Sequence, residues 1–198
     1  MKYTATLSLL LSCALAFATG CSKDNEETVP STETTLTRSI VYHDQARPTR
    51  RDTTFQTKVL VSEAWQYGPY FDVRVYPRAG KEGLVFNLER GSMPAALEGT
   101  YSLKTVENFD ALDTEVSYSF EIPNTMGGSN QYNSNFHTVA GDFTITKFDT
   151  QRLLLDGTYT VTLVDVKDPM AVYGAPNPRH CDVIIRGRFS NLPLQTSK

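Results

Sequence analysis

The sequence predicts an all-β domain, either an antiparallel β-sandwich or a lipocalin-like barrel of about 8–10 strands. Two observations predict this fold class. After residue 38, apolar and polar residues alternate with a period of two in several short stretches, as half-buried antiparallel strands require. Turn residues interrupt these stretches repeatedly, and no window of about eleven residues shows the 3.6-residue period of an amphipathic helix.

The alternation assigns one inward face to each expected strand. The inward sets are Thr57, Val59 and Val61; Phe71, Val73 and Val75; Leu84, Phe86 and Leu88; Val116, Tyr118, Phe120 and Ile122; Tyr159, Val161 and Leu163; and Cys181, Val183, Ile185 and Phe189. The clearest hairpin joins Asp142–Phe148 to Leu153–Leu163 through turn chemistry at Asp149–Arg152. The best helical candidate is the short stretch Val106–Leu112.

A local glycine–aromatic pattern recurs at uneven spacing. Each glycine stands two residues before an expected inward aromatic residue, in the pairs Gly99 and Tyr101, Gly141 and Phe143, Gly157 and Tyr159, and Gly187 and Phe189. Glycine in a strand permits a bulge or a close backbone approach. We therefore expect these glycines to shape the sheet rather than to bind a ligand.

The N-terminus has the three zones of an export signal. Lys2 precedes an apolar stretch, Leu7–Phe17, which is short for a transmembrane helix. Ala18, Thr19, Gly20 and Cys21 follow and resemble the lipobox of bacterial lipoproteins, with Ala18 where leucine is commoner. The resemblance implies a lipoprotein signal peptide at residues 1–20 and lipidation of Cys21, whose two or three acyl chains would give stable anchoring. The alternative is an ordinary secretory signal.

Residues 21–37 are rich in Thr, Glu and Ser and have few apolar residues, which predicts a flexible stalk. A single β-domain is expected to follow at residues 38–198. Ser22–Glu27 resembles the short acidic signal that sends Bacteroidota lipoproteins to the cell surface, although Lys23 and Asn25 interrupt it. A solvated tether is the alternative reading. The expected location is the outer membrane, lipid-anchored, with display at the cell surface as the finer expectation.

The C-terminal half also carries a resemblance. The stretches EGTYSL, AGDFTITKFDTQRLLLDGTYTVTLVDV and VIIRGRFSNLPL are similar to small Bacteroidota lipoproteins of unknown function, in which a G-x-(F/Y)-x-I-T-K-F-D strand precedes G-T-(Y/F) and G-R-F strands. The resemblance covers roughly residues 98–194. It implies a β-sandwich or lipocalin-like barrel and brings no catalytic residues with it.

Composition narrows the functional classes. The chain has a net charge of −3, and loss of the first twenty residues, which contain Lys2 and no acid, makes it −4. A mildly acidic protein is a poor candidate for a nucleic-acid partner. Cys13 leaves with the signal and Cys21 is expected to be lipidated, so Cys181 is the remaining thiol and no intrachain disulfide is expected.

No motif predicts catalysis, a metal or a cofactor. His43, His137 and His180 lack the spacings that place two imidazoles on one metal. His180 and Asp182 share one side of a strand, while Cys181 points to the other and reads as a buried small hydrophobe. Neither a Gly-x-Ser-x-Gly elbow nor a phosphate-binding glycine loop is present.

Two features keep ligand binding open. Trp65, Tyr67, Tyr70 and Phe71 cluster around Gly68-Pro69. They can stack on a sugar ring or an apolar ligand, or else form a core-and-turn cluster in which Trp65 fills one end of the fold. Tyr132 lies in the polar stretch Asn124–Phe136, expected to be a loop that is either functional or disordered. Separately, Asp52-Thr53-Thr54 matches the short motif of Bacteroidota O-glycosylation, which makes Thr53 a candidate glycan acceptor.

These features favour a membrane-anchored envelope lipoprotein whose β-domain binds a ligand or partner, which could be a glycan, a lipid or an envelope protein. One alternative is an accessory structural component of an envelope complex. A second alternative is a hydrolase that uses carboxylates, which requires two acidic groups converging in a cleft. The sequence alone does not choose between the candidate ligands.

Overall fold

The computed structural model describes residues 30–43, 49–80, 82–108, 113–122, 128–172, 174 and 176–197. The predicted signal peptide, Cys21 and residues 22–29 of the predicted stalk lie outside this described part. Contacts divide the chain into Met1–Pro30 and Ser31–Lys198, and everything below concerns the second unit. Within the described residues, no helix combines the length and the apolar character needed to cross a membrane.

The described residues form eleven strands and two single-turn 3-10 helices. The strands are β1 (Glu33–Tyr42), β2 (Arg50–Phe55), β3 (Leu60–Tyr67), β4 (Tyr70–Pro77), β5 (Glu82–Glu89), β6 (Gly99–Ser102), β7 (Glu115–Glu121), β8 (Ser129–Asn133), β9 (Val139–Asp149), β10 (Leu154–Lys167) and β11 (His180–Ser197). The 3-10 turns are η1 (Thr57–Val59) and η2 (Arg90–Ser92). The all-β fold class predicted from the sequence is therefore confirmed.

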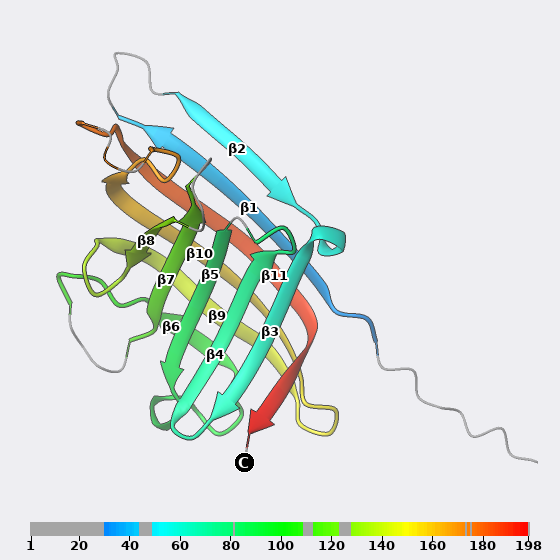
Figure 1. The fold of residues 1–198 in the computed structure, drawn as a ribbon. Helices are drawn as coiled ribbons and strands as arrows, with labels where there is room; N and C mark the ends of the chain where they lie inside the picture. The colour runs from blue at the N-terminus through cyan, green and yellow to red at the C-terminus, as the bar shows by residue number, and fades with distance from the viewer. Residues whose placement is uncertain are drawn as a thin grey trace, which may run out of the picture. The chain divides into compact units, whose positions relative to one another are not determined.

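The strands belong to one curled sheet whose two halves face each other (Figure 1). Sheet A has the order β2-β1-β11-β10-β9-β6, and sheet B has the order β3-β4-β5-β7-β8. Strand β11 joins the halves, because its first part pairs with β1 and β10 and its last residues pair with β3. The β11–β3 pairing is parallel, whereas the other pairings between named strands are antiparallel, so the sheet is mixed rather than purely antiparallel.

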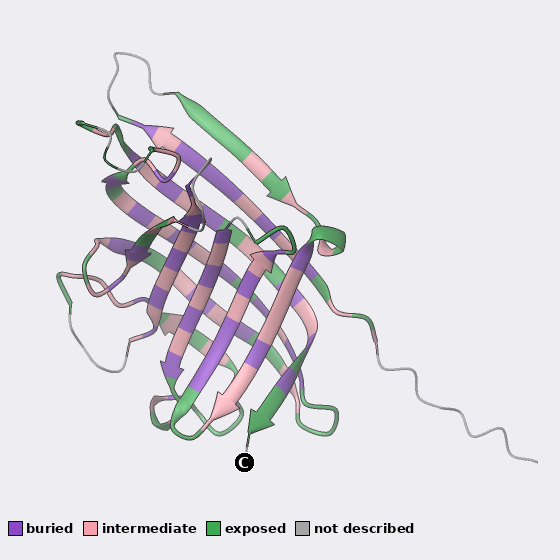
Figure 2. Cartoon of the chain, in the orientation of Figure 1, coloured by how far each residue is buried: buried purple, intermediate pink, exposed green. Residues whose placement is uncertain are grey.

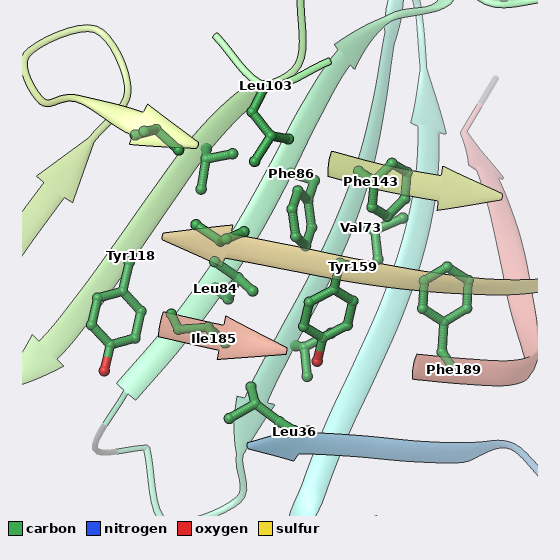
Figure 3. Close-up of a cluster of buried hydrophobic side chains, with 14 of the residues drawn as sticks. Leu36, Val73, Leu84, Phe86, Leu103, Tyr118, Phe143, Tyr159, Ile185 and Phe189 are labelled. Carbon is green, nitrogen blue, oxygen red and sulfur yellow. The ribbon is translucent and has the colours of Figure 1, made fainter. Parts of the chain in front are cut away.

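The core lies between the two halves. The ring centroids of Phe86 from sheet B and Phe143 from sheet A are 4.6 Å apart, and the Phe86 and Tyr159 centroids are 5.4 Å apart. Figure 3 shows these rings directed into a common interior from both halves. Alternation of buried and less buried residues along the strands, visible in Figure 2, accounts for this packing, since every second side chain points to the same side.

Five of the six predicted inward sets are buried as expected, and one is wrong. Thr57 to Val59 form the turn η1 instead of a strand, and Val59 is exposed. Strand β3 begins at Leu60, and Leu60 and Ala64 are its core residues. Val59 and Val61 resemble an inward pair in the sequence. Because the strand starts after the turn, the even-numbered residues Leu60 and Ala64 point inward instead.

Strand β1 begins five residues before the predicted domain boundary. Glu33–Thr37, assigned to the stalk from its polar composition, are the first part of β1 and pair with residues 186–190 of β11. Thr34 is buried although polar, and its hydroxyl lies 2.7 Å from the Ser62 hydroxyl. Threonine is β-branched and favours strands, but it is polar. The threonines of β1 therefore hid the alternation of apolar and polar residues by which a strand is recognised.

Two further expectations changed. Residues 129–133 of the stretch expected to be a loop form β8, which pairs with β7, while residues 123–127 lie outside the described part. Of the helical candidate Val106–Leu112, the described residues 106–108 form a turn closed by a Thr105–Asn108 bridge. The predicted hairpin is confirmed as β9 and β10.

The predicted structural role of two of the glycines is evident from sterics. Gly157 faces Phe189, and Gly187 faces Tyr159, in the ladder between β10 and β11. A Cβ atom at Gly157 would overlap the Phe189 ring, and one at Gly187 would overlap the Tyr159 ring. Each aromatic ring therefore covers the bare backbone of the glycine opposite, which locks the two strands in register.

Candidate functional site

The solvent side of sheet B carries most of the predicted ligand-binding residues. Along the ladder, Trp65 on β3 lies opposite Asp72 on β4, which lies opposite Asn87 on β5. Tyr67 lies opposite Tyr70, and the two ring centroids are 5.8 Å apart. We call this surface the aromatic face, and define it by eight residues: Glu63, Trp65, Tyr67, Tyr70, Asp72, Arg74, Tyr76 and Asn87.

A buried carboxylate organises the aromatic face. Asp72 is only 2% exposed although it points away from the core. It accepts hydrogen bonds from the Tyr67 hydroxyl (2.9 Å), from Nη2 of Arg74 (2.8 Å) and from the Asn87 amide. A buried carboxylate is stable when it is paired and hydrogen-bonded, so Asp72 fixes the orientation of three neighbours whose other surfaces face solvent.

A second pair extends the ordered surface. The Tyr76 hydroxyl donates to a carboxylate oxygen of Glu63 at 3.0 Å. Burial, and then hydrogen bonding to Glu63, raise the pKa of Tyr76, as burial and Asp72 raise the pKa of Tyr67. Both phenols therefore remain protonated and able to donate at neutral pH, and both hold fixed orientations.

The predicted aromatic cluster divides between two sides of the sheet. Phe71 is a core residue, whereas Trp65 and Tyr67 are half-buried on the solvent side and Tyr70 is 42% exposed. Trp65 thus lies on the outside of sheet B and does not plug the end of the core. The division follows from strand alternation, because Phe71 has the opposite parity to Tyr70 and Asp72.

Tyr132 lies far along the sheet order from this surface. It is 4% exposed, and its hydroxyl donates to the backbone oxygen of Lys167 at 2.7 Å. It forms part of the wall of a polar pocket of about 380 Å³ where edge strand β8 of sheet B meets the ends of β10 and β11 of sheet A. The residues lining the pocket are Asn130, Gln131, Tyr132, His137, Asp165, Val166, Lys167 and His180.

Thr53, the candidate glycan acceptor, is half-buried on β2. Its hydroxyl accepts a hydrogen bond from Nη2 of Arg38 at 3.1 Å. A glycan on Thr53 would have to share or replace this contact.

Cys181 is fully buried, and burial together with nearby carboxylates raises its pKa to about 12, which makes its thiol a weak nucleophile at neutral pH.

The carboxylates of the pocket do not form a hydrolytic pair. Asp165 is the single acidic residue among those lining it, and Glu82, which is buried elsewhere, is 2.7 Å from Arg38 and 2.8 Å from the Tyr118 hydroxyl. Among the described residues, no group of three or more His, Cys, Asp or Glu side chains is placed to hold a metal ion.

Sequence reasoning missed the polar half of the aromatic face. Alternation along the strands predicts only that Asp72, Arg74 and Asn87 point outward. The structure shows that they form the hydrogen-bonded network beside Trp65 and Tyr67. Their alternation with core residues was visible, whereas their register against Trp65 depends on strand pairing.

Comparisons of the chain with protein-family models, with curated proteins and with solved structures find no match.

Proposed function

We propose that this protein is a glycan-binding protein and that the aromatic face is its binding surface. The observation that carries the proposal is the position of Trp65, the one tryptophan of the chain, on the solvent side of sheet B beside a buried, fully engaged carboxylate. A sheet does not need a tryptophan on its solvent side for folding. Amphipathic aromatic rings on rigid elements are suited to ligand contact.

The chemistry of the aromatic face matches that of a sugar. Indole and phenol rings can pack against the C–H groups of a pyranose ring, which is a mostly apolar contact. Hydroxyls of the sugar need donors and acceptors beside those rings, and Arg74, Glu63 and Asn87 supply both kinds. Because hydrogen bonds already fix Tyr67, Arg74 and Asn87, little side-chain entropy would be lost on binding.

Charge favours a neutral glycan over an acidic one. The aromatic face has Glu63 and Asp72 as acids and Arg74 as its base, and Arg74 is already paired with Asp72. Glu89 lies opposite Tyr70 at one border, and Glu115 lies opposite Asn87 at another. Glu115 is itself 3.1 Å from Nζ of Lys104, so Glu63 and Glu89 are the carboxylates that would repel a sulfated or uronic-acid chain. We therefore expect neutral oligosaccharides to bind.

The test uses Trp65 as its own reporter. Titration of the protein with neutral oligosaccharides should change the tryptophan emission saturably, because ligand stacking removes water from the indole. Replacement Trp65→Ala should weaken binding at least tenfold in titration calorimetry, as loss of a central aromatic contact commonly does. Phe136→Ala is the matched control, since Phe136 is 77% exposed and lies outside the aromatic face.

Two results would reject this function. One is the absence of saturable binding across a broad panel of neutral oligosaccharides. The other is a panel hit that Trp65→Ala and Phe136→Ala weaken equally, which would place the site elsewhere. Tyr67→Phe refines the test, because it keeps the ring but removes the hydroxyl that donates to Asp72.

We also propose that lipid on Cys21 holds this binding domain on the outer membrane. The support is the sequence alone, namely the apolar stretch and the Ala-Thr-Gly-Cys motif. Mass spectrometry of the protein purified from membranes should find acyl chains on an N-terminal Cys21, and Cys21→Ser should release the protein into the detergent-free fraction. An unmodified cysteine in membrane-derived protein would refute the anchor.

A further inference from the structure

The polar pocket beside Tyr132 brings together histidines that are far apart in the sequence. His137 and His180 line it, and His43 contacts Asp165, which also lines it. All three histidines of the chain therefore gather at one edge of the curled sheet. Its volume of about 380 Å³ falls within the range of small-molecule sites, roughly 300–1,000 Å³.

Asp165 occupies an irregular position that opens the end of β10. The ladder between β10 and β11 shifts register between Leu163 and Val166, and Asp165 within this bulge has a φ of 50°. A non-glycine residue in the left-handed region is uncommon and needs support from its surroundings. Here the support is a hydrogen bond from the Asp165 backbone N–H to Oδ1 of Asp182, at 2.9 Å.

The carboxylates near the pocket already have partners. The Asp165 carboxylate is 3.1 Å from Nδ1 of His180 and 3.5 Å from Nδ1 of His43. Asp182 is 3.1 Å from Nε2 of His43, and Asp168 accepts a hydrogen bond from the Met170 backbone at 2.9 Å. The Asp165, Asp182 and Asp168 carboxylates therefore already have hydrogen-bond or histidine partners within the protein.

Lys167 is different. It lies directly opposite His180 in the β10–β11 ladder, it is exposed, and the described part of the chain offers its ammonium no ion-pair partner. His180 already has Asp165 as a partner, with its Nδ1 3.1 Å from the carboxylate. A bound anion beside Lys167 would supply the ion-pair partner that the described residues do not give it, and would complete the pocket wall.

We propose that the pocket is a second binding site, for a small organic anion that places a carboxylate or phosphate group between Lys167 and His180. The Tyr132 and His137 rings, whose centroids are 5.5 Å apart, supply an apolar wall for the body of the ligand. Gln131 and Asn130 supply amides for its polar substituents. This site is independent of the aromatic face and takes the opposite class of ligand.

The experiment is titration calorimetry of the full-length Trp65→Ala chain in detergent at pH 7.0, a variant in which the aromatic face should not take up sugar. The probes are glucuronate, its neutral counterpart glucose, and inorganic phosphate. We expect saturable binding of glucuronate or phosphate and none of glucose at the same concentration. Binding of glucuronate alone identifies a carboxylate ligand, and binding of phosphate alone identifies a phosphate ligand.

Variants separate this site from the aromatic face. Lys167→Met should weaken anion binding at least tenfold, while Lys147→Met, which changes another exposed strand lysine on β9, should leave it unchanged. His180→Gln should also weaken anion binding, because His180 lies opposite Lys167 in the ladder. Trp65→Ala should leave anion binding intact, so failure of the glycan proposal would not affect this one.

Three outcomes would overturn the inference. They are no binding of either anion, equal binding of glucose and glucuronate, or equal affinities for Lys167→Met and Lys147→Met. Lys167, Lys147 and His180 are exposed and Trp65 is half-buried, and far-UV circular dichroism of each variant checks that the sheet remains folded.

Discussion

At the scale of single residues, the core contains one charged pair, Arg38 and Glu82, that apolar alternation does not explain. Arg38 on β1 reaches across the interior to Glu82 on β5 at 2.7 Å, and Tyr118 on β7 donates to the same carboxylate oxygen at 2.8 Å. The Arg38 guanidinium also lies over the Phe120 ring, 5.1 Å from its centroid. This cluster ties sheet A to sheet B through charge, at a position where both charges are almost fully withdrawn from water.

Breaking this pair should be costly. Glu82→Gln leaves the Arg38 charge buried without its counter-ion, so the free energy of unfolding should fall by about 3–5 kcal/mol. The double variant Arg38→Met, Glu82→Leu removes both charges and should lose clearly less. Urea denaturation followed by circular dichroism measures both values, and equal stability of wild type and Glu82→Gln would contradict the prediction.

Cys181 should behave as an inert core residue. With its pKa raised to about 12, mainly by burial, about one thiol in 10⁴ is ionised at pH 8, and the thiolate is the reactive form. In a chain carrying Cys13→Ser and Cys21→Ser, Cys181 should resist a disulfide reagent under native conditions and react fully in urea. Fast labelling of the folded protein would show that the thiol is accessible and would count against a core role.

At the scale of strands, sequence periodicity predicted the interior well because it depends on local alternation. Phe71, Phe86 and Tyr118 were assigned to the core from their strands alone. Pairing between distant strands was beyond this reasoning, since the register of β11 against β1 and β3 is set by packing of residues more than 100 positions apart. The aromatic face depends on the register of β3, β4 and β5, which alternation along a single strand does not give, so its aromatic residues were predicted and its Asp72 network was not.

The glycine–aromatic pairs of β10 and β11 provide an element-scale prediction. Gly187→Ala would place a methyl group against the Tyr159 ring and the Thr35 backbone oxygen, so it should lower the free energy of unfolding by about 1–3 kcal/mol, as overpacking does. Gly91→Ala is the matched control, because nothing lies within 4 Å of the added methyl group and its φ is not positive. Similar unfolding midpoints in urea for the two variants would refute a packing role for Gly187.

The ends of β1, β10 and β11 should respond to pH through His43. The hydrogen bond that the His43 ring donates to the Asp182 carboxylate, opposed by some burial, raises the pKa of His43. A raised pKa in the folded state gives stability that is complete below the unfolded pKa of about 6.5 and is lost as pH rises through the folded value. Because the groups are largely exposed, the contribution should be below about 1 kcal/mol.

Unfolding midpoints measured from pH 5.5 to pH 8.5 check this effect. His43→Gln should flatten the pH dependence over this window while changing stability at pH 8.5 very little. A dependence that is unaltered in His43→Gln would assign it to other groups.

At the scale of the whole molecule, β11 makes the two halves of the sheet interdependent. Its 18 residues pair with β1 and β10 in sheet A and then, beyond Asn191 with its φ of 51°, with β3 in sheet B. The change of pairing partner along β11 explains why the sequence indicated a sandwich or a barrel without distinguishing them. Alternation reports which side of a strand is buried, whereas the choice of architecture depends on where one strand leaves its neighbours.

The shared strand predicts cooperative unfolding of both halves. Urea transitions followed by Trp65 fluorescence, which reports on sheet B, and by circular dichroism, which reports on all strands, should coincide, as a two-state domain requires. Ending the chain after Pro193 removes the β11 residues that pair with Ala64 to Tyr67, so the fluorescence transition should move to lower urea and separate from the circular dichroism transition. If the two transitions already differ in the intact chain, the halves fold independently, and the aromatic face would then owe its order to sheet B alone.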